Sequence, residues 1–273
     1  FATQSWGDLW EWCTRIDNQM PLHFALLKGW GAFGGTSEFA LRLPSVWSTL
    51  LAVAALIALG RRLGSSWMGW LAAIAFGLTQ SFLYAAFEVR PYGVALALTG
   101  WASVVLWELW QRYAVCGRRR DRRFATLLFA YWLLAWGLWY THYTGVLVLT
   151  VHAALVGWAV LRRPERRRGT IALQLAGGTV AGMLPWYLAL AGRDVRAGTA
   201  YAGRVDPLTA LKTYADFYAH GQRAVPADAP PYTWAVVAVL ALGCLLWYAL
   251  RRWHRQPVCS LLVPLVGTLL PLT

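Results

Sequence analysis

The sequence LPSVWSTLLAVAALIALGRR, residues 43–62, decides the fold, because it is an apolar run of membrane-spanning length that ends in two arginines. A helix needs about 20 mostly apolar residues to cross the hydrocarbon core of a bilayer. Similar runs recur along the chain, so we predict an all-α, polytopic transmembrane helical bundle. Its eight predicted spans are residues 43–60, 67–85, 91–110, 124–140, 145–161, 170–191, 233–250 and 257–273.

The composition agrees with a membrane protein. Of the 273 residues, 58% are hydrophobic, and 18 are Trp, whereas soluble domains average roughly 45–50% apolar residues. A net charge of +13 would suggest a nucleic-acid partner if the basic residues formed one face of a globular domain. They instead form short clusters between the apolar runs, so we expect no nucleic acid to bind.

The basic clusters fix the orientation, because they fall in alternate loops between the predicted spans. Together with Glu108, Asp121 and Glu165, they carry the whole net charge of +13, and the opposite side is neutral. By the positive-inside rule, the clustered side is cytoplasmic. The clustered residues are Arg61, Arg62, Arg112, Arg118, Arg119, Arg120, Arg122, Arg123, Arg162, Arg163, Arg166, Arg167, Arg168, Arg251, Arg252 and Arg255.

These arginines are best interpreted as topology anchors that contact anionic lipid, with no catalytic role. The outer side is distinguished by two long loops, residues 1–42 and 192–232. Ser5 and Asp8 form a capping-box pattern before Trp6, Leu9, Trp10, Cys13 and Ile16 at helical spacing, which predicts an interfacial helix. A second outer helix is predicted from Asp206-Pro207; it either packs on the membrane domain or gates a substrate.

Three outer segments hold the polar groups that are candidates for chemistry. In Phe87–Gly93 (FEVRPYG), Pro91 suits a first helical turn, so free backbone N–H groups beside Arg90 would form an anion site, to which Tyr92 adds a hydroxyl. Glu88 could bind a metal, accept a proton or pair with Arg90. In the tight turn Trp139–Gly145 (WYTHYTG), the aromatic residues and His142 are either functional or an interfacial belt with a structural histidine.

The third segment is Asp17–His23 (DNQMPLH), between two predicted interfacial helices. Asp17 is either a functional carboxylate or a helix cap. The four cysteines have no metal-ligand spacing, and only Cys13 falls on the outer side, so we expect neither a zinc site nor a disulfide framework. The chain starts without Met and stops inside an apolar run, so we expect a partial transmembrane domain, truncated at both ends.

These segments, in this order, resemble the GT-C class of membrane glycosyltransferases, which includes lipopolysaccharide core sugar transferases, aminoarabinose transferases and protein mannosyltransferases. Asp17–Phe24 is similar to the Asp-x-x-Pro-Pro-Leu-Tyr-Tyr stretch of that class, with Met20 in place of the first Pro and His23 and Phe24 in place of the aromatics. The resemblance covers residues 5–165 best. Its other motifs are Ser37–Ser45 (SEFALRLPS), Gly60–Gly64 (GRRLG), Glu-x-Arg-x-Tyr at 88–92 and Tyr-Thr-His-Tyr-x-Gly at 140–145.

The resemblance implies transfer of a sugar from a polyprenyl-phosphate donor to a glycan, lipid or protein acceptor at the outer face of the bacterial plasma membrane. It implies no nucleotide cofactor and leaves a divalent cation open. By this resemblance Glu88 and Asp17 are the catalytic candidates, and Arg90, Tyr92, His142 and Tyr140 are the substrate-binding candidates. One feature departs from the class: its leading acidic motif would precede Phe1, and that role is not transferred to Asp8 or Asp17.

Two other functions fit the sequence. A transporter or flippase of lipid-linked sugars would use similar spans and an anion site, but transporters place polar groups near the bilayer midplane, where this chain has only His152 as an ionisable residue. A catalytically silent subunit of an envelope-assembly complex also fits. The collection of polar groups at the outer rim favours the transferase.

Overall fold

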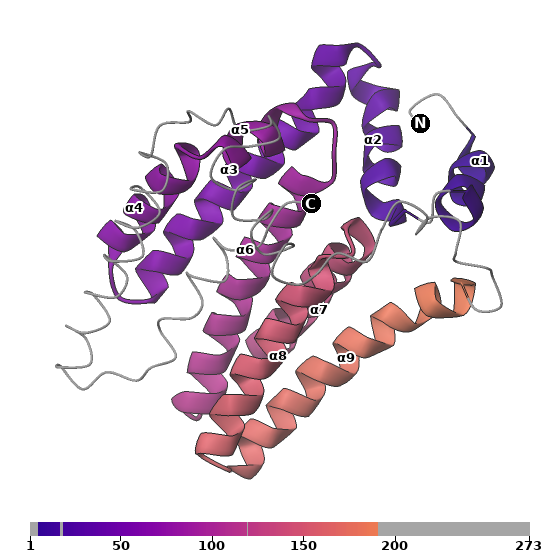
Figure 1. The fold of residues 1–273 in the computed structure, drawn as a ribbon. Coiled ribbons are helices and arrows are strands. Elements are labelled where there is room, and N and C mark those ends of the chain that lie inside the picture. The colour runs from indigo at the N-terminus through magenta and orange to yellow at the C-terminus, as the bar shows by residue number, and fades with distance from the viewer. Residues whose placement is uncertain (1–4, 17–18, 119, 191–273) are drawn as a thin grey trace, which may run out of the picture.

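The computed structural model describes residues 5–16, 19–118 and 120–190, and this part of the chain is helical without strands. The described helices form an elongated bundle, with the short N-terminal helices at one end (Figure 1). The elements, in order, are α1 (Trp6–Glu11), a π-helix η1 (Trp12–Ile16), α2 (Pro21–Gly34), α3 (Glu38–Arg62), α4 (Ser66–Gly77), α5 (Gln80–Phe87), α6 (Tyr92–Leu109), a π-helix η2 (Trp110–Val115), α7 (Arg122–Thr141), α8 (Gly145–Arg162) and α9 (Arg166–Leu190).

Five helices in the described part are long and apolar enough to cross a membrane. They are α3, α6 continued by η2, α7, α8 and α9, and they coincide with five of the predicted spans. The chain is therefore compatible with a multi-pass membrane protein. The predicted spans 233–250 and 257–273 and the predicted outer helix from Asp206 lie outside the described residues, so the total of eight spans stays a prediction.

The predicted span 67–85 is not one straight helix. It is split into α4 and α5, which meet at an angle of 72° and together form a broken span or a re-entrant loop. The break has a local cause: the Thr79 side chain accepts a hydrogen bond from the Phe82 backbone N–H (3.1 Å) and donates one to the Phe76 carbonyl (2.6 Å). A threonine that caps a helix start competes with helix continuation, and the apolar pattern gave no sign of that competition.

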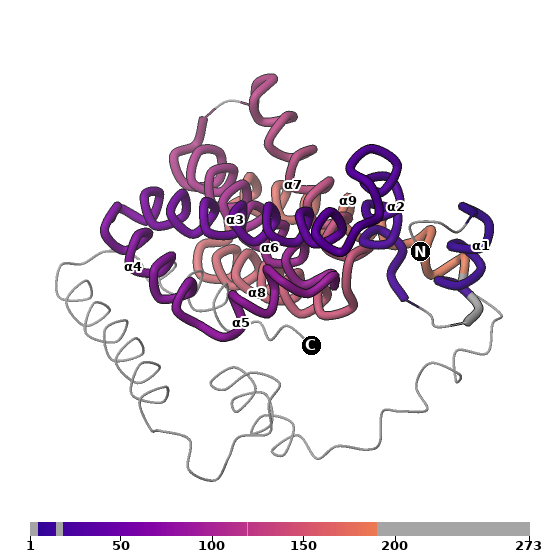
Figure 2. Tube along the Cα trace, turned by 90° about the horizontal axis from the view of Figure 1, so that it is seen from above, coloured from indigo at the N-terminus to yellow at the C-terminus, as the bar shows by residue number. Residues whose placement is uncertain are grey.

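Helix α6 is the centre of the bundle, because it packs against both α3 and α7. More than half of its most apolar stretch is buried, a larger share than in any other candidate span of the described part. Small residues allow the close approach of α3: a Cβ atom added to Gly100 would lie 2.6 Å from the Ala55 Cβ. Seen along a perpendicular direction, α6 lies among α3, α7 and α8, and α1 lies to one side (Figure 2).

A ladder of hydrogen bonds joins α7 to α9. The Trp132 and Trp136 indole nitrogens and the Tyr140 hydroxyl donate to the backbone carbonyls of Gln174, Gly178 and Gly182, at 3.1, 2.9 and 2.9 Å. Each donor is four residues from the next, and so is each acceptor, so the two helices run parallel in constant register. The ladder gives three polar aromatic groups a partner inside an apolar bundle.

The N-terminal helix forms as its capping box predicts. The Ser5 hydroxyl accepts from the Asp8 backbone N–H at 3.1 Å, and the Asp8 carboxylate accepts from the Ser5 backbone N–H at 3.2 Å. Leu9 and Cys13 are buried in a cluster with Trp139 and Trp186, while Trp6 and Trp10 are exposed. The predicted helix is confirmed, and its placement in a membrane interface stays a prediction.

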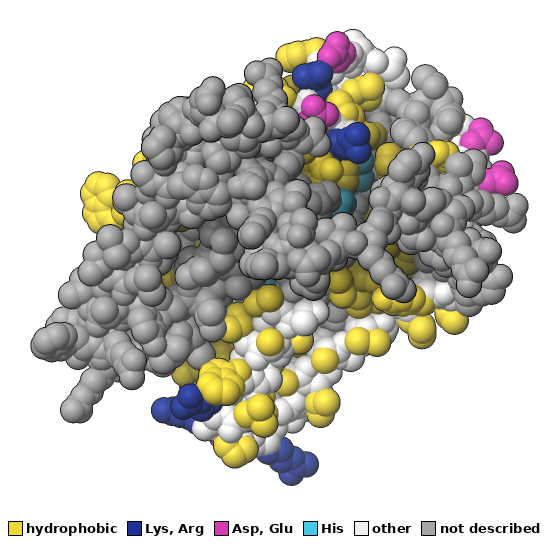
Figure 3. Space-filling view, viewed as in Figure 1, with side chains coloured by type: hydrophobic (Ala, Val, Ile, Leu, Met, Phe, Trp, Pro, Cys, Tyr) yellow, Lys and Arg dark blue, Asp and Glu magenta, His cyan; other side chains and the backbone are white. Residues whose placement is uncertain are grey.

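The charged side chains gather at the two ends of the described bundle. In the face shown by Figure 3, acidic and basic side chains lie together at the end that carries α2, and basic side chains lie at the opposite end. The described surface between them is mostly apolar. The end with α2 is called the outer end below, and the opposite end, which carries Arg62, Arg112, Arg123 and Arg166, is called the basic end.

Candidate functional site

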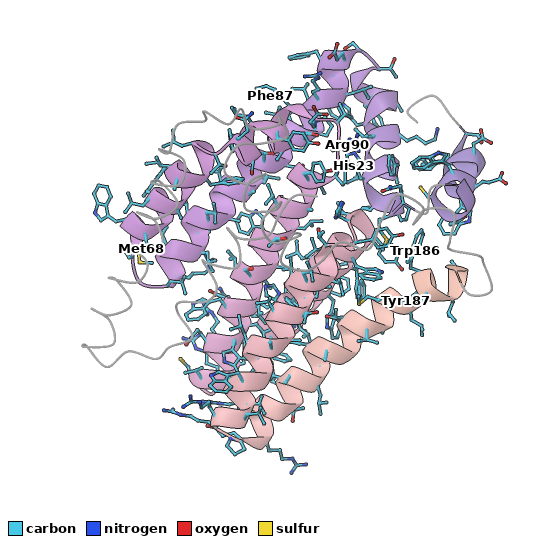
Figure 4. The ribbon with its side chains drawn as sticks, viewed as in Figure 1. His23, Met68, Phe87, Arg90, Trp186 and Tyr187 are labelled. Carbon is cyan, nitrogen blue, oxygen red and sulfur yellow. The ribbon has the colours of Figure 1, made fainter. Side chains whose placement is uncertain are left out.

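The outer end brings together residues from four parts of the sequence. They come from the first turn of α2, the end of α5, the start of α6 and the turn between α7 and α8. Figure 4 shows Arg90 and His23 next to each other, between the α5–α6 connection and α2. We call this group the outer cluster: His23, Tyr84, Glu88, Arg90, Tyr92 and His142.

Arg90 is a cation without a protein partner in the described part of the chain. It is exposed and takes part in no hydrogen bond or ion pair with a described residue. Glu88, two residues before it, is also exposed and unpaired within the same residues. The predicted alternative in which Glu88 merely neutralises Arg90 is therefore absent from this structure, and both side chains are available to a ligand.

The start of α6 adds to the positive character of the cluster. Pro91 immediately precedes the helix, which begins at Tyr92, and no side chain caps its first turn. The first turn of α2, which contains His23, also has no side-chain cap. Uncapped N-terminal N–H groups carry partial positive charge and favour anions, so they reinforce the guanidinium of Arg90.

Aromatic rings hold the middle of the cluster. The buried Tyr92 ring lies 5.3 Å from Tyr84 and 5.7 Å from His142, measured between ring centroids. Tyr92 is placed at this depth by close packing at the next residue, because a Cβ atom at Gly93 would lie only 2.8 Å from the Ser45 carbonyl oxygen. A glycine is therefore needed where α6 starts against α3.

His142 is held in one tautomer by its own turn. Its Nδ1 accepts a hydrogen bond from the Thr144 backbone N–H at 3.2 Å and lies 2.8 Å from the Thr144 hydroxyl. A backbone N–H can only donate, so Nδ1 is unprotonated and the neutral ring carries its proton on Nε2. Burial lowers the pKa of His142 below its ordinary value. His142 therefore presents a neutral N–H donor.

His23 and Tyr84 are the two members of the cluster that the sequence did not identify as site residues, and His23 is the more deeply buried. Its side chain is 2% exposed, and its Nε2 has no hydrogen-bond partner among the described residues. Burial lowers the pKa of His23 to about 4; the nearby Arg90 and His142 act in the same direction, and the Val89 backbone opposes them. A buried nitrogen without a partner is costly in a finished core, so this atom is a candidate contact for a ligand.

The remaining predicted residues fall elsewhere. The Tyr140 hydroxyl donates to the Gly182 carbonyl and its ring packs on Trp186, so it stabilises the α7–α9 contact instead of joining the outer cluster. Asp17 lies outside the described residues. One sequence feature could have identified His23 as a site residue: it lies two residues after Pro21, where the GT-C stretch has an aromatic residue. For Tyr84, the only such feature was its spacing of four residues from Glu88.

The outer cluster has the chemistry of an anion site next to a carboxylate. Arg90 and the first turn of α6 can bind a phosphate, and His142 adds a neutral N–H donor to the cluster. Glu88 can accept a proton or contact a cation. No group of three or more His, Cys, Asp or Glu side chains that could hold a metal ion occurs among the described residues.

Comparison with known proteins adds no family to this description. No family model matches the chain, and neither a curated protein nor a solved structure matches it. The likeness to the GT-C class therefore rests on the sequence motifs alone.

Proposed function

We propose that this protein is a membrane glycosyltransferase that moves a sugar from a polyprenyl-phosphate donor to a glycan, lipid or protein acceptor at the non-cytoplasmic face of a bacterial plasma membrane. The observation that carries the proposal is the outer cluster itself, in which an unpaired arginine, an uncapped helix start and an unpaired carboxylate lie at one end of a bundle of apolar helices. The order of the GT-C-like motifs along the sequence supports it.

The proposed reaction assigns a role to each side chain. The acceptor oxygen attacks the anomeric carbon of the sugar, and the bond between that carbon and the phosphate oxygen breaks. The electron pair of the broken bond leaves on the phosphate, where Arg90, the α6 N-terminus and His142 Nε2–H stabilise the added charge. Glu88 accepts the proton of the attacking hydroxyl. Asp17 stays a second candidate for this proton transfer.

The surface of the bundle suits a lipid-linked donor, because an apolar helix surface adjoins the polar outer end. The polyprenyl chain is apolar and can lie against the exposed apolar surface of the helices, which includes Trp67, Leu71, Leu173 and Leu188. Its phosphate would then be held at the outer end, where the bundle surface turns polar. A donor delivered through the membrane requires no nucleotide site.

The transporter alternative draws on one buried polar group. His152 on α8 lies in the bundle interior, with its Nε2 3.1 Å from the Ser103 hydroxyl of α6 and its Nδ1 3.3 Å from the Tyr131 hydroxyl of α7. Both ring nitrogens therefore have protein partners, which favours a cross-link between three helices over a substrate site. The silent-subunit alternative predicts that no sugar donor is cleaved or moved in the assay below.

The test is a transfer assay with the full chain reconstituted in liposomes and a panel of polyprenyl-phosphate sugars. We expect at least one donor to give a glycosylated acceptor together with free polyprenyl phosphate. If the folded protein instead moves a donor across the bilayer and leaves its glycosidic bond intact, it is a flippase. If it neither cleaves nor moves any donor in the panel, the enzyme proposal is wrong.

A further inference from the structure

A recess at the basic end, far from the outer cluster, is lined almost entirely by arginine. It has a volume of about 430 Å³ and lies between the connection that precedes α7 and the first turns of α9. The residues that line it are Arg118, Arg120, Arg166, Arg167 and Thr170. The Thr170 hydroxyl already donates to the Arg166 carbonyl at 2.8 Å, so recognition in the recess depends on the four guanidinium groups.

Nearby acids are already engaged by other groups. Glu108 forms ion pairs with Arg62, Arg112 and Arg123, and Glu165 pairs with Arg168 at 3.4 Å.

Asp121 is engaged as well. Its carboxylate accepts from the Tyr113 hydroxyl at 2.7 Å and from the Phe124 backbone N–H at 2.9 Å, and these two bonds hold the pKa of Asp121 below its usual value. None of the four lining arginines takes part in an ion pair with a residue that the structure describes. The recess therefore gathers four positive charges, none of which is bound in an ion pair to a described residue, and the nearby Asp121 carboxylate stays ionised.

The backbone is shaped to bring these arginines together. Gly117 has a φ of +69°, and a Cβ atom at this position would lie 2.3 Å from the Arg167 guanidinium. The left-handed backbone at Gly117 favours glycine for the turn, and the absence of a side chain there leaves the space that the Arg167 guanidinium occupies. The Arg118 backbone N–H donates to the Arg112 carbonyl at 3.1 Å, which fixes the other wall of the recess. The positive first turn of α9, which begins at Arg166, adds to the field.

The depth of the recess indicates the source of its ligand. It opens where α7 and α9 begin, and both helices are long and apolar enough to cross a membrane. Residues at the start of such helices lie at the depth of the lipid headgroups. Arginine binds phosphate through two parallel hydrogen bonds, and basic pockets between transmembrane helices on the cytoplasmic side bind phosphorylated headgroups. We propose that this recess binds the headgroup of an anionic lipid that carries two phosphate charges.

This site is separate from the proposed catalytic chemistry, so its test needs no sugar donor. The full chain is purified in detergent, and its affinity for cardiolipin, phosphatidylglycerol, phosphatidylcholine and inorganic pyrophosphate is measured by native mass spectrometry and by thermal stabilisation. We expect cardiolipin to bind with the highest affinity and phosphatidylcholine not to bind. If phosphatidylglycerol equals cardiolipin at matched charge, or if only soluble pyrophosphate binds, the assignment is wrong.

A matched pair of variants separates the recess from general basic charge. The double variant Arg118→Gln/Arg167→Gln removes two lining arginines, and the control Arg61→Gln/Arg163→Gln removes two arginines of the same end that do not line it. We expect roughly a 30-fold loss of cardiolipin affinity in the first, from the typical contribution of a juxtamembrane cation, and less than about a twofold change in the second. Equal losses in the two variants would overturn the proposal.

A third variant keeps the proposal testable if the glutamine variant does not fold. Arg118→Lys/Arg167→Lys keeps both positive charges and loses the planar fork of the guanidinium. We expect it to fold. We also expect it to bind cardiolipin more weakly than the wild type does and more tightly than the glutamine variant does. Affinity equal to that of wild type would contradict recognition by guanidinium groups.

Discussion

At the scale of single residues, two buried histidines of the described bundle differ in how their ring nitrogens are satisfied. The buried ring of His152 has a partner at each nitrogen, whereas the buried Nε2 of His23 has none among the described residues, and the exposed Arg90 and Glu88 have none either. Polar groups that a fold leaves unsatisfied are expected at sites where a ligand completes them. His23 is therefore as informative as the charged residues beside it.

His23 also predicts a pH dependence of stability. Its pKa falls from 6.5 to about 4 in the folded chain, so the folded state binds the proton less tightly than the unfolded state does. Its stabilising contribution is present above about pH 6.5 and is lost as the pH falls toward 4. Thermal unfolding in detergent at pH 7 and pH 5 is expected to show a larger loss in wild type than in His23→Gln, by roughly 2 kcal/mol.

One result of these pH-dependent melts would contradict the burial of a neutral His23. If wild type and His23→Gln lose the same stability between pH 7 and pH 5, the ring is not buried in a neutral form. His142, whose pKa is lowered in the same direction, is present in both proteins and cancels in the difference.

At the scale of elements, the contact between α7 and α9 depends on glycine. A Cβ atom at Gly178 would lie 2.0 Å from the Trp132 ring, and one at Gly182 would lie 2.0 Å from the Trp136 indole nitrogen, whereas one at Gly177 would meet nothing within 4 Å. The two adjacent glycines on α9 therefore face different surroundings. One of them accommodates the hydrogen-bond ladder, and the other is dispensable for packing.

This difference predicts opposite effects of one substitution at adjacent positions. Gly178→Ala forces the Trp132 ring to shift and is expected to destabilise the bundle by about 1–3 kcal/mol. Gly177→Ala is expected to be neutral or to stabilise by up to about 1 kcal/mol, because alanine favours the helix. Thermal melts of both variants in the same detergent measure the difference. A Gly178→Ala variant as stable as Gly177→Ala would show that the two helices do not pack in this register.

The elements also show what the sequence could predict and why the rest was inaccessible. Apolar run length located five long helices correctly, because a run of about 20 apolar residues favours one continuous helix of that length. It missed the bend at Thr79, because capping by one hydroxyl hardly changes hydrophobicity. The prediction grouped Tyr140 with His142 because the two are close in sequence. In the structure, helix geometry points the Tyr140 side chain toward α9 and leaves His142 at the helix end. Arg90, Tyr92 and His142 were identifiable because each follows or starts a span at the same end.

At the scale of the whole molecule, two positive features lie at opposite ends and have different environments. The outer cluster contains one unpaired arginine beside an unpaired carboxylate, and the basic end contains four arginines around a recess, none of which forms an ion pair with a described residue. Charge alone cannot distinguish an anchor from a site. A ligand site is distinguished from a lipid anchor by whether its arginines are free of ion pairs and by whether a helix N-terminus lies next to them.

The orientation of these ends in the membrane is directly testable. Cys116 is exposed at the basic end, and Tyr143 is exposed in the outer turn. In sealed spheroplasts, a membrane-impermeant maleimide is expected to label Tyr143→Cys in a background without Cys116 and to leave the native Cys116 unlabelled until the cells are lysed. The reverse pattern would place the outer cluster in the cytoplasm and would remove the basis for a polyprenyl-linked donor at the outer face.

The most direct measurement for the central claim is sugar transfer from a polyprenyl-phosphate donor by the full chain, compared in wild type, Arg90→Ala and Lys28→Ala. Lys28 is a cation of the same end that lies over the Trp6 ring, so its variant controls for the loss of one positive charge. We expect Arg90→Ala to insert normally and to lose about 10²–10³-fold in turnover, as for the loss of one stabilising donor, and Lys28→Ala to stay within about twofold of wild type. Unchanged transfer by Arg90→Ala would contradict the account.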